Sequence, residues 1–234
     1  GPDCSQSYDC GTSVTLTAAA DTATSRFGGW GGACMGATAT CTVAMTDVRS
    51  VTATFDLLPR RLDVALAGTG TGTVTSSPAG ISCETDCDES FPHGTSVTLT
   101  ARPGTGSTVG GWSVAGCSGT TCAVSMTAAR TVTVTFTRQR HRLTVSSNAS
   151  HGTVTSSPAG IDCGADCMED YDYGTSVALT ARPATGYVFS SWGGDCSASI
   201  CSVTMTEARN VSARFVITQR ALDVTVRGTG AGRV

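Results

Sequence analysis

The 234-residue sequence contains no lysine and few aromatic residues, which make up 6% of the chain. All 15 basic residues are therefore arginines, and the net charge of −3 gives the chain no general attraction for nucleic acid. No apolar run approaches the roughly 20 residues that a transmembrane helix needs, so we expect no membrane span in this segment. A secretory leader is also missing, and we expect either a processed chain or part of a longer protein.

Cysteine, in contrast, is abundant and regularly placed. The chain contains 12 cysteines, and they recur in pairs along the sequence. Such a pattern is typical of proteins in an oxidising compartment. We therefore expect an extracellular or cell-surface location and structural disulfides.

Several markers recur about every 80 residues and indicate a tandem array. The stretch GTVTSSPAGI is spelled out at 72–81 and again at 152–161, and GTSV begins at Gly11, Gly94 and Gly174. The predicted division is a first repeat at 1–58 that lacks its opening strand, a second repeat at 59–139, a third at 140–218, and a lone opening strand at 219–234.

Within each repeat, apolar and polar residues alternate with a period of two, which is the pattern of half-buried β-strands. In SVTLTA, Val97 and Leu99 fall on one face and Thr98 on the other. Thr and Val are β-branched and suit a pleated surface, and Gly and Pro interrupt the runs at regular intervals. The sequence therefore predicts an all-β fold of small tandem domains.

The cysteine pairing can be inferred from the first repeat. A small domain with few large side chains commonly needs covalent cross-links, and four cysteines per repeat allow three connectivities. The first repeat lacks the cysteine that would precede Gly1, but it has an additional one, Cys10, where the other repeats have His93 and Tyr173. This replacement makes sense if the first two cysteines of a repeat pair with each other. The predicted disulfides are Cys4–Cys10, Cys34–Cys41, Cys83–Cys87, Cys117–Cys122, Cys163–Cys167 and Cys196–Cys201.

The order of these motifs resembles that of the divergent InlB B-repeat family. The shared pattern is G-x-V-T-S-S-P-A-G-I-x-C…C…G-T-S-V-x-L-T-A-x-P…G-W…C…C-x-V-x-M-T…R-x-V-x-A-x-F, and it covers nearly the whole chain. The resemblance implies a small β-grasp-like fold, repeated in tandem in secreted and surface-attached bacterial proteins. It also implies a structural or adhesive role, without catalytic residues to carry over.

Metal binding is the main alternative for the cysteines and the acidic loops. Four thiolates per repeat would suit zinc, but CETDC and CSGTTC do not have the CxxC spacing of zinc knuckles. The loops CETDCDES and CGADCMEDYDY could bind calcium through carboxylates, but neither contains Dx[DN]x[DN]G. We expect disulfides, no metal and no cofactor, although the sequence leaves calcium at the acidic loops open.

One tryptophan and one closing phenylalanine recur in each repeat. A tryptophan could stack on a sugar, but a lone one beside a cysteine pair more often packs against that pair in the core. The rows of outward-facing threonines resemble those of ice-binding surfaces. We do not expect ice binding, because threonine is also an ordinary exposed strand residue. We predict core positions for Trp30, Trp112, Trp192, Phe55, Phe136 and Phe215.

Catalysis finds no support in the sequence. His93, His141 and His151 occupy unrelated positions, and cysteines in disulfides cannot act as nucleophiles. Two classes remain: a structural stalk, fibre or adhesin, and a ligand- or carbohydrate-binding accessory module of a secreted enzyme. We favour the structural class, with further copies of the chain, other surface proteins or glycans as partners.

The segment 221–234, ALDVTVRGTGAGRV, is an opening strand without a repeat behind it. Leu222, Val224 and Val226 alternate as Leu62, Val64 and Leu66 do, so we expect one face to require burial. This strand of one molecule could complete the first repeat of the next and generate a head-to-tail fibre. An excerpt of a longer array and a closed ring explain the same pattern, and the sequence leaves all three open.

Overall fold

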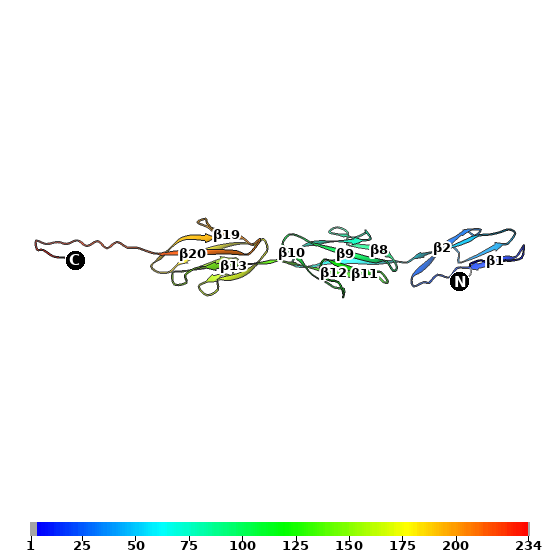
Figure 1. The fold of residues 1–234 in the computed structure, drawn as a ribbon, viewed down its shortest axis with the longest axis horizontal. Coiled ribbons are helices and arrows are strands. Elements are labelled where there is room, and N and C mark those ends of the chain that lie inside the picture. Colours follow the sequence, from blue (N-terminus) through cyan, green and yellow to red (C-terminus); the bar gives the residue numbers. More distant parts are fainter. Residues whose placement is uncertain (1–3, 234) are drawn as a thin grey trace. The chain divides into compact units, whose positions relative to one another are not determined.

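A computed structural model describes residues 4–233, and every regular element in that range is a β-strand (Figure 1). The predicted all-β class is therefore confirmed. The first repeat contains β1 (Ser13–Thr17), β2 (Ser25–Gly32), β3 (Thr40–Ala44) and β4 (Val51–Leu57). The second contains β5 (Pro59–Gly68), β6 (Gly72–Ser77), β7 (Ser82–Cys83), β8 (Asp88–Pro92), β9 (Ser96–Pro103), β10 (Ser107–Trp112), β11 (Thr121–Ser125) and β12 (Arg130–Arg138). The third contains β13 (Arg140–Ser146), β14 (Gly152–Ser157), β15 (Asp162–Cys163), β16 (Met168–Asp172), β17 (Ser176–Pro183), β18 (Tyr187–Gly194), β19 (Cys201–Thr204) and β20 (Arg209–Ile217).

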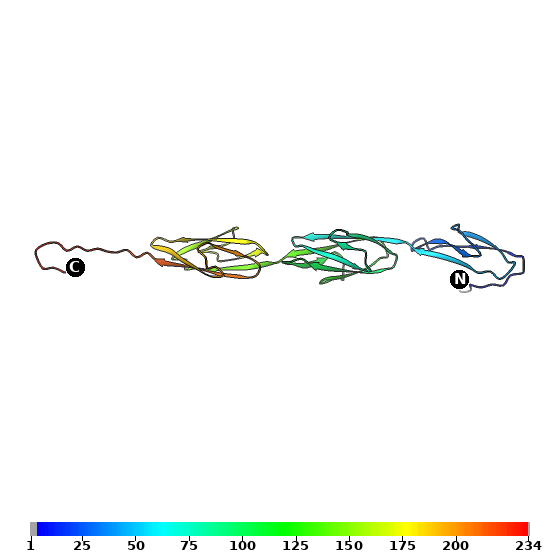
Figure 2. The same ribbon diagram turned by 90° about the horizontal axis from the view of Figure 1, so that it is seen from above.

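Each complete repeat consists of two four-stranded sheets around one core (Figures 1 and 2). In the second repeat the sheets have the orders β10-β12-β5-β8 and β11-β9-β6-β7, and the third repeat reproduces both orders. The central strands β5 and β12 are parallel, and so are their counterparts β13 and β20. The strand that opens a repeat therefore lies beside the strand that closes it.

The residues that face the core are those that the alternation selects. Val97 and Leu99 of β9 are fully buried, whereas Thr98 between them is exposed. In β12, Val134 and Phe136 are likewise buried. Burial of one such side chain contributes about 1.5–3 kcal/mol, so a small repeat depends on every strand that covers this core.

The stretch GTVTSSPAGI forms β6 and the turn to β7, and its second copy forms β14 and the turn to β15. Val74 and Ile81 are buried, and Ser76 connects the two ends of the turn. The Ser76 hydroxyl donates to the carbonyl oxygen of Pro78 at 2.8 Å and accepts the Ile81 N–H at 2.9 Å. Val74, Ser76 and Ile81 are therefore fixed by the core and the turn. In the second copy Val154 and Ile161 are likewise buried, and Ser156 Oγ accepts the Ile161 N–H.

Single residues separate consecutive repeats, since Leu58 lies between β4 and β5, and Gln139 between β12 and β13. Leu58 N–H donates to the carbonyl oxygen of Thr24 at 2.9 Å, and Arg60 Nη2 donates to that of Ala23. The chain divides into two compact units, one ending at Thr137 and the other beginning at Arg138. The described residues contain no helix long and apolar enough to cross a membrane.

Candidate functional site

Within residues 4–233, one side of the first repeat is not covered by the strands that cover it in the other two repeats. Its strands β1, β2, β3 and β4 correspond in sequence to β9, β10, β11 and β12, and they form only the pairs β1–β3 and β2–β4. The segment 4–12, which corresponds to β8 and its turn, contains no strand. Among the described residues, the first repeat therefore has no counterpart of β5, β6 and β7.

The closing strand shows the consequence most clearly. β12 lies between β10 and β5, whereas β4 pairs with β2 alone within residues 4–233. Phe136 is 1% exposed and Phe215 is 7% exposed, but Phe55 is 44% exposed. The prediction of a core position is therefore wrong for Phe55, because the strand that covers its counterparts is missing from the described chain.

An open hollow of about 1030 Å³ lies on this side of the first repeat. Its apolar lining includes Val14 and Leu16 of β1, Val43 of β3 and Val51 of β4. Val14 and Leu16 are half-buried, whereas their counterparts in the second repeat are fully buried. The coil 4–10 and the turn 45–50 form the rest of the lining, so polar groups surround this apolar patch. The patch itself gains about 25 cal/mol for each Å² of apolar surface removed from water.

A segment with the required apolar alternation lies exposed at 221–233. Within 218–233 the structure contains no strand, and Figure 1 draws this segment as a trace without arrows. Leu222 is 86% exposed and Val224 is 53% exposed, whereas their counterparts Leu62 and Val64 are 0% and 6% exposed. Val226 is 62% exposed, but its counterpart Leu66 is also exposed, at 42%. These side chains have the alternation of an opening strand, and within residues 4–233 the segment joins no sheet.

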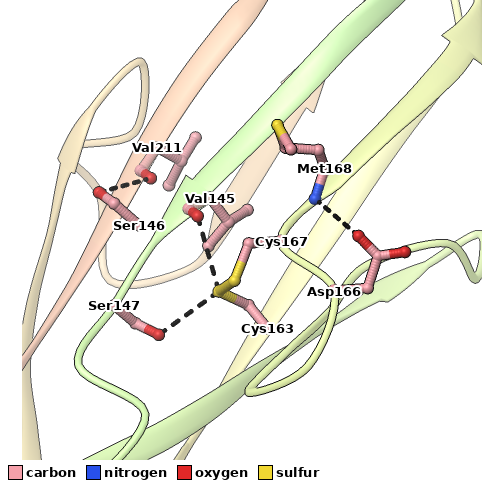
Figure 3. The surroundings of a disulfide bond; sticks show 8 residues. All are labelled: Val145, Ser146, Ser147, Cys163, Asp166, Cys167, Met168 and Val211. Atoms are coloured by element: carbon pink, nitrogen blue, oxygen red, sulfur yellow. Dashed lines mark hydrogen bonds between the residues drawn. A yellow bond between two sulfur atoms is a disulfide. The ribbon is translucent and has the colours of Figure 1, made fainter.

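Five of the six predicted disulfides are present in the structure. They join Cys34 to Cys41, Cys83 to Cys87, Cys117 to Cys122, Cys163 to Cys167 and Cys196 to Cys201. Figure 3 shows the Cys163–Cys167 bond between β15 and β16, where Cys163 Sγ lies 3.6 Å from the carbonyl oxygen of Val145 and 3.5 Å from Ser147 Oγ. Each of these bonds closes a loop within one repeat, so each stabilises its own domain.

The sixth predicted disulfide is not formed in the structure. Cys4 and Cys10 are both exposed and are not joined. Cys83 and Cys87 flank a tight turn, in which Ser82 accepts and donates main-chain hydrogen bonds with Asp86. The coil 4–10 has no strand pairing of this kind to bring its two cysteines together.

The three tryptophans lie beside the cysteine loops. Trp192 is buried in the core, while Trp30 and Trp112 are half-buried. Trp30 Nε1 donates to the carbonyl oxygen of Thr38 at 2.9 Å, and Trp112 Nε1 donates to that of Gly119 at 3.0 Å. These two tryptophans therefore fix the disulfide-closed loops of the first and second repeats to the sheet.

Acidic loops and arginines form ion pairs at the start of each complete repeat. Arg142 Nε donates to Asp170 Oδ1 at 3.0 Å, and this hydrogen bond lowers the pKa of Asp170 below its ordinary value. Arg61 pairs in the same way with Asp63 at 2.9 Å and with Asp88 at 3.2 Å, which raises the pKa of Arg61. Across residues 4–233, no three metal-ligating side chains gather in one place. Exposed pairs of this kind are surface salt bridges of modest energy.

A family model assigns the repeats. The model of the divergent InlB B-repeat domain matches residues 1–58, 62–140 and 143–219. The chain belongs to the divergent InlB B-repeat family. It thus consists of tandem B-repeats of the type found in bacterial surface proteins, and the family predicted from the sequence motifs is confirmed. No curated protein matches the chain.

Among solved structures, the Bacillus anthracis TIE protein is similar to this B-repeat chain with a TM-score of 0.44 and 7% sequence identity. The similarity covers 87% of this chain and 51% of the TIE protein chain. The chain therefore spans about half the length of that structure.

The sequence pattern identifies the apolar segment 221–234 but not the hollow, since none of Val14, Leu16 and Val43 was singled out from the sequence. The signal was present, because β1 repeats the sequence of β9 while the first repeat lacks the GTVTSSPAGI strand that pairs with β9. Reading strand neighbours as well as strand patterns would have identified the hollow.

Proposed function

We propose that this chain is a non-enzymatic structural protein of the bacterial cell surface, in which tandem B-repeats build a fibre, stalk or adhesin. Membership of the family and five disulfides support an extracellular setting. The observation that carries the proposal is that each complete repeat has its own core and its own disulfides. Domains that are stable individually can be added in series, so repetition extends the protein without requiring new contacts.

We further propose that the chain polymerises head-to-tail by strand exchange. The segment 221–233 of one molecule, which we call the donor strand, occupies the hollow of the first repeat of a second molecule. β5 pairs with β12 in parallel, with Val64 opposite Val132 and Gly68 opposite Phe136. The same register aligns the donor strand with β4, so that Val224 lies opposite Val51.

In this register, the donor strand also supplies the missing cover for Phe55. In the second repeat the ring of Phe136 packs directly against Gly72, where a Cβ atom would collide with it. The donor strand preserves this spacing, since Gly228 corresponds to Gly68 and Gly232 to Gly72. Gly228 and Gly232 therefore leave room for the ring of Phe55 beside the donor strand.

The contact joins two different surfaces of the chain, so it need not close on itself. The hollow lies on the first repeat, and the donor strand follows the third. A heterologous contact of this type generates an open fibre unless the geometry happens to form a ring. Main-chain hydrogen bonds of the added strand supply affinity, and the alternating side chains supply register.

Substitution on the two faces of the donor strand tests this proposal. Val224→Asp places a charge on the inward face, and Thr225→Asp places the same charge on the outward face as a matched control. We expect assembly of the full chain, measured by sedimentation velocity over a range of concentrations and by electron microscopy, to be lost in V224D and retained in T225D. Deletion of 221–234 should abolish it as well.

Assembly that survives the deletion would exclude the donor strand. A compact monomer at every concentration, with the Phe55 ring protected, would indicate a closed ring in place of a fibre. If residues preceding Gly1 in a longer natural chain fill the hollow, that longer form should stay monomeric, and strand exchange would be wrong for it.

A further inference from the structure

In each complete repeat, the first and the last strand are neighbours and run in the same direction. In the second repeat, the parallel ladder between β5 and β12 extends from the pair Leu62–Arg130 to the pair Gly68–Phe136. In the third, the ladder between β13 and β20 extends from Leu143–Arg209 to Ser146–Ser212. The chain therefore enters and leaves each repeat through two strands that are hydrogen-bonded to each other.

This arrangement determines how a stretching force acts. Tension on the chain pulls β5 by its N-terminal end and β12 by its C-terminal end. Because the strands are parallel, these pulls slide them past each other along their common axis, and the hydrogen bonds of the ladder are loaded together. In an arrangement where strands are peeled apart from one end, the bonds break one after another at lower force.

The two loaded strands are also the best-held strands of their sheet. β5 and β12 are the central pair in the order β10-β12-β5-β8, so each has a neighbour on its other edge as well. Leu62 and Val64 from β5 pack in one core with Val132, Val134 and Phe136 from β12. Sliding one strand past the other therefore disrupts a close-packed core as well as a ladder of hydrogen bonds.

The disulfides lie outside the path of the force. Cys83 and Cys87 join β7 to the start of β8, and Cys117 and Cys122 close the loop before β11. Neither bond links β5 to β12. They hold the remainder of the repeat together while the ladder alone bears the tension.

We propose that the complete B-repeats of this chain have a mechanical function: each is a shear clamp that bears tensile load through its parallel terminal strands. This inference rests on the proposed surface fibre or stalk for its biological setting. The second repeat has seven ladder pairs and the third has four, so the second resists the greater force. The first repeat has no parallel partner for β4 within residues 4–233 and unfolds at the lowest force.

Single-molecule stretching of the full chain between its two ends tests the clamp. We expect two high-force unfolding events, each releasing roughly 200 Å of chain for a repeat of about 80 residues whose two disulfide loops stay closed. In a second geometry, the N-terminal pulling handle is attached instead to an azide-bearing side chain that replaces the exposed Thr71, after β5. The fold is unchanged, but the tension now peels β5 from β12. The second repeat should then unfold at a several-fold lower force, while the third keeps its value.

Two proline variants separate the clamp from general destabilisation. Val64 N–H donates toward β8, so Ala65 N–H faces β12, and Ala65→Pro removes a bond of the clamp. Ser76 N–H donates toward β7, so Thr75 faces β9, and Thr75→Pro removes a comparable bond outside the path of the force. Ala65 and Thr75 are both exposed. A65P should lower the unfolding force several-fold and T75P only slightly.

Equal unfolding forces in the two pulling geometries would overturn the proposal, and so would equal losses of force in A65P and T75P. The two-geometry comparison needs no substitution in a strand, so it remains decisive if either proline variant fails to fold. Because it is carried out on single molecules, its failure would leave strand exchange between molecules unaffected.

Discussion

The first and second repeats have the same sequence markers but differ in the state of their cores. SVTLT forms β1 in one and most of β9 in the other, yet its apolar side chains are half-buried in β1 and fully buried in β9. Phe55 and Phe136 close the two repeats at equivalent positions, but their exposed fractions are 44% and 1%. A B-repeat core therefore depends on its opening strand, which lies at the opposite end of the repeat's sequence from the closing phenylalanine.

The largest effect is expected when the closing phenylalanine is truncated. Phe136→Ala should lower the free energy of unfolding of the second repeat by about 4 kcal/mol, because it leaves a cavity in a closed core. Phe55→Ala should cost far less in the monomeric chain, since that ring is already partly in water. Denaturant titration of the two variants, followed by near-UV circular dichroism, measures both effects. Equal losses would show that the first repeat is covered in solution.

A smaller effect should follow from filling the space beside that ring. Gly72→Ala places a Cβ atom against Phe136 and should destabilise the second repeat by about 3 kcal/mol, at the upper end for overpacking. Gly232→Ala meets no atom within 4 Å and should leave the stability of the monomer unchanged. If strand exchange occurs, the second variant should instead weaken assembly. Thermal unfolding and sedimentation of both variants distinguish these outcomes.

Removal of one disulfide should have a moderate effect. Replacing both Cys83 and Cys87 with alanine opens a loop of about five residues, and we expect a loss of about 2 kcal/mol in the chain-entropy model. In the first repeat, peptide mapping of the oxidised chain without reduction should show whether Cys4 pairs with Cys10, as the sequence predicts. A link from Cys4 or Cys10 to any other cysteine would refute that pairing.

The smallest effect concerns pH and is confined to the surface of the third repeat. The hydrogen bond from Arg142 makes the pKa of Asp170 lower in the folded than in the unfolded state. Its stabilising contribution is therefore present above the unfolded pKa and is lost as the pH falls through the folded pKa. We expect the melting temperature to fall slightly less on acidification in Asp170→Asn than in the parent chain. No difference between the two would show that the pair contributes nothing measurable, as many surface pairs do.

Much of the fold followed from local pattern. Alternation identified the strands, as with Val97 and Leu99, and the compensating Cys10 led to five correct pairings of neighbouring cysteines. The structure does not join Cys4 to Cys10. That pairing stays a prediction, which peptide mapping tests. The exposed state of Phe55 could not be read from its own neighbourhood, since the residues around it match those around Phe136.

The period of the array, the strands, the cysteine loops and the family can all be read from the sequence. All of these depend on residues close together in the chain: alternation within a strand, a turn within ten residues, a disulfide across four to seven. The parallel pairing of the opening strand with the closing strand is visible only in the folded structure. That contact joins β5 to β12 across the length of a repeat, and no local pattern specifies it. This contact nevertheless closes the core of a complete repeat and places both ends of that repeat on one ladder. Its absence within residues 4–233 leaves the first repeat open.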